Sequence, residues 1–100
     1  MEYHKLVRDK IPEYIRAKGG LPIFHVASEG EYWAKLVEKL KEETSEFAAD
    51  PSLEELADVL EVVDAVLAHQ PFIHTELLKI RKKKAEERGI FKDYIILDES

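Results

Sequence analysis

The 100-residue sequence predicts a single, mainly α-helical domain that spans residues 1–100 and contains about four helices. Three observations predict this fold class. Apolar residues recur at intervals of three and four along most of the chain. Capping residues, prolines and glycines mark the ends of the helical segments. Runs typical of β-strands are confined to residues 22–27 and 93–97, which we expect to pair as a minor two-stranded element.

The first 27 residues are predicted to form a short helix followed by a strand. Pro12 suits the first position of a helix, where its missing N–H costs no hydrogen bond, and Gly19-Gly20 ends that helix. The run PIFHVA that follows is short, apolar and rich in residues that favour strands.

A long helix is predicted over roughly residues 29–49. Ser28 followed by Glu31 has the spacing of a capping box. Apolar residues at helical spacing then define one buried stripe, which consists of Trp33, Leu36, Val37, Leu40 and Phe47.

A third helix is predicted to run to about His69, with Asp50 as its N-cap and Pro51 as its first residue. Ser52 with Glu55 is a rival capping box, but the assignment to Asp50 leaves Glu55 available for other contacts. This helix is apolar on two sides, so we expect one side to meet a second subunit. The first side carries Leu53, Leu56, Leu60, Val63 and Leu67, and the second carries Val59, Val62, Ala65 and Val66.

A fourth helix is predicted from Pro71 to about Arg88, with Gly89 as the residue that ends it. The second β-like run, residues 93–97, follows.

Composition restricts the classes of function. The formal net charge of −6 argues against a nucleic acid polymer as partner. The absence of cysteine excludes disulfides, thiol catalysis and zinc–thiolate sites. No apolar run is long enough to span a bilayer, so we expect a soluble, cytoplasmic protein without a membrane partner.

Four carboxylates are predicted to converge between the second and third of these helices. At 100° per residue, Glu43 lies at the edge of one apolar stripe, about 60° from Leu40, and Glu46 lies one step further round the same side. Glu55 and Asp58 lie three residues apart on an apolar side of the next helix. Converging carboxylates need a compensating cation, and a set of oxygen donors without His or Cys suits Mg²⁺ or Mn²⁺.

Two points about these acids remain open on the residues alone. The alternative to a metal site is a solvated acidic helix face, which is the usual reading of a string such as EETSE. Glu61 and Asp64 continue the acidic series at a spacing of three and are secondary candidates behind the first four.

Basic residues are predicted to bind an anion near the acids. Lys84 and Arg88 lie on the inward side of the fourth helix, where they suit phosphate groups held at a metal. Lys5 and Arg8 would add to the same pocket. The alternative for Arg88 is a salt bridge to an acid of the core.

The order of these motifs resembles a known superfamily. EETSE (42–46) followed by ELAD (55–58) resembles the EExxE…ExxD signature of the all-α nucleoside triphosphate pyrophosphohydrolases. The segments YHKLVRDKIPEYI, ELADVLEVVDAV and IRKKKAEERGIF are similar to a compact MazG-like branch, often described as phosphoribosyl-ATP pyrophosphohydrolase-like.

The resemblance implies a MazG-like helical bundle completed by oligomerisation, as a homodimer or homotetramer. It implies Mg²⁺ ligation by Glu43, Glu46, Glu55 and Asp58. Glu42 and Glu43 would be the catalytic residues, with Glu42 beside the metal or orienting the attacking water.

The implied reaction splits a nucleoside triphosphate into a monophosphate and pyrophosphate, with nucleotide-pool sanitation as its role. A second substrate, phosphoribosyl-ATP in histidine biosynthesis, would need the same metals and the same bond cleavage. A different class also remains open, in which a non-catalytic helical oligomer binds a nucleotide or a protein partner.

Overall fold

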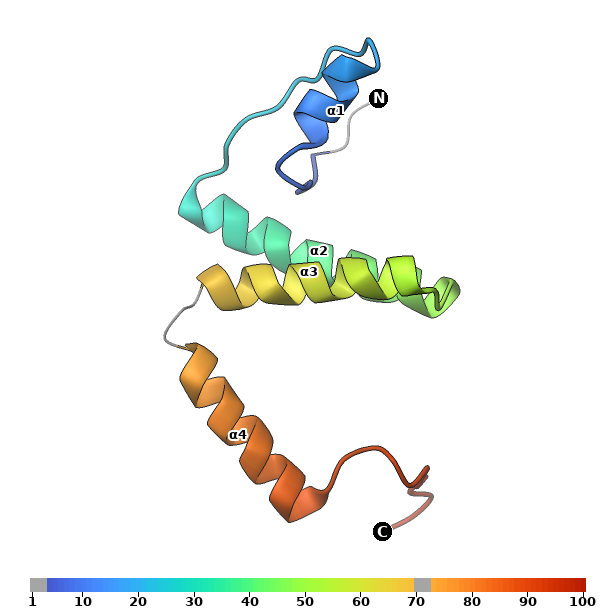
Figure 1. Cartoon of the computed structure of the whole chain (residues 1–100). Helices are drawn as coiled ribbons and strands as arrows, with labels where there is room; N and C mark the ends of the chain where they lie inside the picture. The colour runs from blue at the N-terminus through green and yellow to red at the C-terminus, as the bar shows by residue number, and fades with distance from the viewer. Residues whose placement is uncertain (1–3, 70–72) are drawn as a thin grey trace. The chain divides into compact units, whose positions relative to one another are not determined.

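The computed structural model describes residues 4–69 and 73–100, and these residues contain four α-helices and no β-strand (Figure 1). The predicted all-α class is therefore confirmed. The helices are α1 (Ile11–Ala17), α2 (Glu29–Ala49), α3 (Leu53–His69) and α4 (Ile73–Arg88). The chain divides into two compact units, Met1–Val66 and Leu67–Ser100, and each is described by itself.

Helix α1 ends as its sequence predicts and begins at Ile11, one residue before the predicted first position. Pro12 lies in the first turn, where a helix has no use for its amide hydrogen. Gly19 ends the helix with φ +87°, a conformation that side chains disfavour. The amides of Gly19 and Gly20 donate to the carbonyls of Arg16 and Ile15, so the last turn keeps its hydrogen bonds.

Helix α2 has the predicted bounds and one half of the predicted capping box. The hydroxyl of Ser28 accepts a hydrogen bond from the amide of Glu31 at 3.3 Å. The carboxylate of Glu31 does not return the bond. Its two oxygens lie 2.8 and 3.1 Å from Nε2 of His25 instead.

The prediction that Asp50 caps α3 is wrong, and the rival assignment to Ser52 is correct. Asp50 still belongs to the end of α2, because its amide donates to the carbonyl of Glu46 at 2.9 Å. The hydroxyl of Ser52 accepts the amide of Glu55 at 3.2 Å, and its carbonyl accepts the amide of Leu56. The difference arises because Asp50 is used by the preceding helix.

The prediction of strands at residues 22–27 and 93–97 is also wrong. Neither run is a strand in the described parts of the chain, and the side chains of Ile23 and Val26 are exposed. Strand propensity reflects how a side chain fits a pleated surface, whereas a strand also needs a neighbour for its backbone N–H and C=O groups. Neither run has such a neighbour among the described residues.

The core of the Met1–Val66 unit lies between α2 and α3, which run antiparallel side by side (Figure 1). Leu36 on α2 is 1% exposed and Val62 on α3 is 8% exposed. Within the Met1–Val66 unit, the opposite side of α3 is not covered by α1 or α2. Its exposed members, which we call the outer face of α3, are Leu53, Leu56, Leu60 and Val63.

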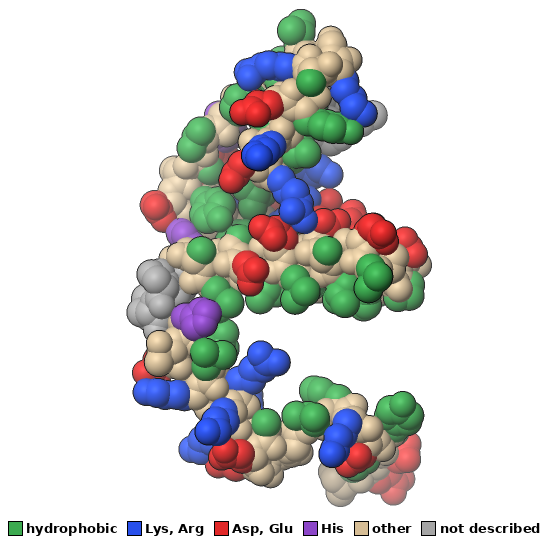
Figure 2. Space-filling model, in the orientation of Figure 1, with side chains coloured by type: hydrophobic (Ala, Val, Ile, Leu, Met, Phe, Trp, Pro, Cys, Tyr) green, Lys and Arg blue, Asp and Glu red, His purple; other side chains and the backbone are tan. Residues whose placement is uncertain are grey.

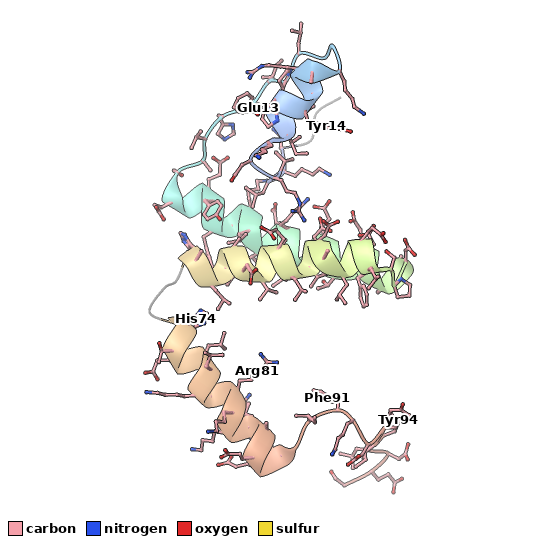
Figure 3. All side chains as sticks on the ribbon, viewed as in Figure 1. Glu13, Tyr14, His74, Arg81, Phe91 and Tyr94 are labelled. Carbon is pink, nitrogen blue, oxygen red and sulfur yellow. The ribbon has the colours of Figure 1, made fainter. Side chains whose placement is uncertain are left out.

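The Leu67–Ser100 unit consists of the end of α3, helix α4 and the segment that follows α4. Gly89 ends α4 as predicted, with φ +83° and its amide on the carbonyl of Ala85. Phe91 and Tyr94 project from the segment after α4 (Figure 3). The predicted start of this helix at Pro71 falls outside the described residues. Across 4–69 and 73–100, the helices are too short or too polar to cross a membrane.

Candidate metal centre

Helix α2 places one carboxylate inside its apolar stripe. Glu43 follows Leu36 by seven residues, so the two side chains point within about 20° of each other around the helix. Glu43 is consequently only 5% exposed. Among the described residues, it is the charged residue that the fold buries. Glu46 and Glu42 lie about 60° and 100° from Glu43, both on the same side of it around the helix. Glu46 is exposed and Glu42 is half-buried.

Helix α3 brings two further carboxylates to the same place. Val62 is buried against α2, and Glu55 and Asp58 lie about 20° and 40° from it around the helix. Both acids are therefore half-buried at the contact between the helices.

The five acids form two overlapping groups, which together we call the acidic cluster. Oxygen atoms of Glu42, Glu43 and Glu46 lie within 4.8 Å of one another. The same limit holds for oxygens of Glu43, Glu55 and Asp58. Glu43 belongs to both groups and joins α2 to α3. Figure 2 shows acidic side chains gathered along this edge of the helix pair.

Two oxygen atoms of the acidic cluster are buried without a hydrogen-bond partner. They are Oε2 of Glu43 and Oε2 of Glu55. Leaving a buried acceptor unpaired costs about 1–3 kcal/mol, and more when the acceptor is charged. The two atoms come from facing helices, and a cation bound between them would satisfy both.

The capping of α3 explains why the Glu55 side chain is available. A full capping box would turn the Glu55 carboxylate back to the amide of Ser52. In this chain the Ser52 amide donates to the carbonyl of Asp50 at 2.7 Å. Only the backbone of Glu55 takes part in the cap, so its carboxylate is left at the contact with α2.

Among residues 4–69 and 73–100, the ion pairs to the acidic cluster come from three basic side chains. Arg8 lies 2.7 Å from Oδ1 of Asp58, and Lys5 lies 3.4 Å from Oε1 of Glu42. Lys39 lies 3.1 Å from Oε1 of Glu43 and 3.6 Å from Oε2 of Glu42. Blue side chains therefore lie against the acidic edge in Figure 2.

Lys39 is the functional candidate that sequence reasoning missed. Its side chain is only 18% exposed, and its ammonium group contacts the most buried acid. Its position four residues before Glu43 was the available signal, because side chains at that spacing are neighbours on a helix.

The remaining candidates are not members of the acidic cluster. Glu61 and Asp64 are exposed on α3 and belong to neither group of the acidic cluster. Lys84 and Arg88 are exposed on α4, in the Leu67–Ser100 unit. Their placement beside the acids remains a prediction.

The concentration of negative charge raises the pKa of Glu46 above its usual value of 4.5. The main cause is the charge of Glu43, with smaller contributions from burial and from Glu55 and Glu42. The carboxylate of Glu46 is therefore harder to ionise in the folded chain than in the unfolded chain.

This shift predicts a pH dependence of the metal-free protein. The folded chain holds a proton on Glu46 in a window just above pH 4.5, where the unfolded chain has released it. The raised pKa of Glu46 stabilises the folded chain fully below that window, and this stabilisation is lost as pH rises through it. We expect Tm to fall more steeply across the window for wild type than for Glu46→Gln, measured in chelator at low ionic strength. Parallel curves for the two proteins would contradict the electrostatic coupling.

The donor set of the acidic cluster fits a hard divalent cation. All five ligands offered are carboxylates, which suit Mg²⁺ or Mn²⁺ better than zinc. Charge balance agrees, because two positive charges would offset the repulsion that raises the pKa of Glu46. The two unpaired buried oxygens supply an independent reason for a cation at this place.

Comparison with known proteins does not assign the chain to a family. No family model matches it, and no solved structure matches it. A protein of Mycolicibacterium smegmatis described as uncharacterized is 53% identical over 45 residues. That stretch is 45% of this chain and spans about half of that protein, 46% of its length. The chain is thus similar to a protein whose description gives no activity.

Proposed function

We propose that the chain is a Mg²⁺-dependent nucleoside triphosphate pyrophosphohydrolase, with Mn²⁺ as an alternative cofactor. The observation that carries this proposal is Glu43, a buried acid shared by two groups of carboxylates and left with an unpaired oxygen. The order of EETSE and ELAD in the sequence, which resembles the superfamily signature, supports the same reaction.

Glu43, Glu46, Glu55 and Asp58 would hold the cation. When bound, Mg²⁺ supplies neutralisation of phosphate charge and a lower pKa for a coordinated water. Glu42 borders this set and would accept a hydrogen bond from the attacking water, orienting its oxygen toward phosphorus. Its contacts with Lys5 and Lys39 hold the Glu42 carboxylate in position.

In the proposed reaction, one water molecule would attack the α-phosphorus of the nucleotide. A bond forms from the water oxygen to that phosphorus as the bond to the bridging oxygen breaks, releasing pyrophosphate. Phosphoryl chemistry of this kind depends on positioning and charge stabilisation more than on covalent catalysis. Arg8 and Lys5, with Lys84 and Arg88 as predicted partners on α4, would bind the phosphates.

Pyrophosphate release tests the proposal directly. The purified protein should release pyrophosphate and a monophosphate from a nucleoside triphosphate in Mg²⁺, and release should stop in chelator. Canonical and damaged nucleotides, compared with phosphoribosyl-ATP, would separate a cytoplasmic sanitation enzyme from an enzyme of histidine biosynthesis. A folded protein that binds Mg²⁺ but releases no pyrophosphate from any of them would favour the non-catalytic class.

The outer face of α3 supports the homodimer or homotetramer that we propose for the active form. Its four apolar side chains lie within about 80° around the helix, and Leu53 is 82% exposed. Figure 2 shows hydrophobic side chains along the edge of α3 opposite the acids. A contiguous apolar face of this kind is typical of an interface with another chain.

Leu60→Asp is expected to dissociate the oligomer. Leu60 lies within the outer face, and an aspartate there would bury a charge without a partner in the interface. Light scattering with size-exclusion chromatography should show the monomer mass for Leu60→Asp. Leu60→Met conserves size and polarity and should keep the wild-type mass. A monomeric wild type would contradict the proposed assembly.

A further inference from the structure

We propose that Arg8 is an exchangeable counter-ion: it neutralises Asp58 in the metal-free protein and moves to the substrate's phosphates once a divalent cation binds Asp58. This inference rests on the proposed function. It adds a coupling between metal binding and anion binding, which the proposed function does not itself require.

Arg8 lies beside Asp58 although the two residues are far apart in sequence. It lies in the segment before α1, fifty residues from Asp58 in sequence, yet its guanidinium is 2.7 Å from Oδ1 of that residue. Asp58 is at the same time one of the three acids whose oxygens meet across the helix contact. Arg8 therefore contacts one of the three carboxylates that would bind a metal.

The ion pair between Arg8 and Asp58 can be separated at little cost. The side chains of Arg8 and Asp58 are 55% and 41% exposed, so water surrounds the ion pair. Exposed ion pairs contribute little to stability, and separating this pair leaves neither group buried. Lys39 differs, because it is 18% exposed and belongs to the same helix as its partner Glu43. Of Arg8 and Lys39, the two that contact the group Glu43, Glu55 and Asp58, Arg8 is thus the one that a metal can displace at lower cost.

The released guanidinium of Arg8 would find a new partner in a phosphate group at the metal. A cation bound to Asp58 reduces the attraction of that carboxylate for Arg8 and repels a positive charge beside it. A phosphate group at the metal offers the opposite charge nearby. Guanidinium donates two parallel hydrogen bonds to phosphate as readily as to carboxylate, so Arg8 can change partner without losing hydrogen bonds.

The exchange predicts effects of opposite sign for Arg8→Gln. Removing the competing cation should tighten binding of metal alone by about two- to five-fold, the range expected for an exposed ion pair. Removing the phosphate ligand should weaken binding of Mg²⁺–pyrophosphate by a similar or larger factor. Coupling between two ligands of this kind is reciprocal in binding free energy.

Isothermal titration calorimetry of the full chain at low ionic strength tests the exchange, with Mn²⁺ alone and then with Mg²⁺–pyrophosphate at saturating Mg²⁺. Lys41→Gln is the matched control, because Lys41 is an exposed lysine on α2 that points about 160° away from Glu43. It removes the same charge without touching the acidic cluster. Arg8→Lys retains the charge and should restore metal affinity to the wild-type value while recovering only part of the anion affinity.

The outcomes separate the two proposals. Opposite shifts in Arg8→Gln, larger than those in Lys41→Gln, establish the exchange. Equal shifts in the two variants, or a loss of both affinities in Arg8→Gln, overturn it while leaving a metal-binding wild type intact. A wild type that binds no Mn²⁺ overturns the metal centre and the exchange together.

Discussion

Glu43→Gln is expected to abolish Mg²⁺-dependent pyrophosphate release, with kcat/KM reduced by more than about 100-fold. Loss of a group that supports a metal ligand already costs about 10- to 100-fold, and Glu43 is proposed as a ligand itself. It is also the acid that both groups of the acidic cluster share. A coupled pyrophosphate assay on the preferred nucleotide measures the loss.

The control for Glu43→Gln is Glu54→Gln. Glu54 is an exposed acid on α3, next to Glu55 in sequence, and belongs to neither group of the acidic cluster. Glutamine keeps the size of glutamate at both positions, so both variants should fold, which thermal melts would verify. A folded Glu43→Gln protein with at least half of wild-type activity would rule out Glu43 as a metal ligand.

Mg²⁺ is expected to raise the Tm of the wild-type protein by about 10 °C or more at 100 times its dissociation constant. Binding to the native state at that concentration contributes about 2.7 kcal/mol. For a domain of about 100 residues, each kcal/mol moves Tm by roughly 4 °C or more. The physical source is relief of the repulsion among the acids that raises the pKa of Glu46.

Two controls distinguish a bound cation from general screening. NaCl at matched ionic strength screens exposed charges but does not bridge buried oxygens, so it should raise Tm much less. A double variant, Glu55→Gln with Asp58→Asn, removes the α3 side of the acidic cluster and should lose the Mg²⁺ response. Equal shifts with NaCl and Mg²⁺ would assign the effect to screening.

The helices and the meeting of Glu43 with Glu55 and Asp58 could be predicted because both depend on local geometry. The predicted convergence of all four acids is met in part, because Glu46 is grouped with Glu42 and Glu43 on α2 and not with the acids of α3. A residue every 100° fixes which side chains share a direction, so Glu43 follows Leu36 into the buried stripe without any knowledge of the partner helix. A short turn between α2 and α3 then brings Glu55 and Asp58 to the same side.

The errors arose where structure depends on a partner that sequence does not specify. Residues 22–27 have strand-forming side chains, yet across 4–69 and 73–100 no neighbouring strand satisfies their backbone. Asp50 belongs to the end of α2, so it does not cap α3. Lys39 resembles an ordinary surface lysine in sequence apart from its position four residues before Glu43, and its low exposure beside that acid is seen only in the folded chain.

The central claim is that carboxylates from α2 and α3 share a divalent cation, and a crystal structure grown with Mn²⁺ tests it most directly. The account predicts an anomalous peak between the helices, in bonding contact with oxygens of Glu43, Glu55 and Asp58. Well-ordered helices at saturating Mn²⁺, with these carboxylates turned to solvent and no peak between them, would contradict it.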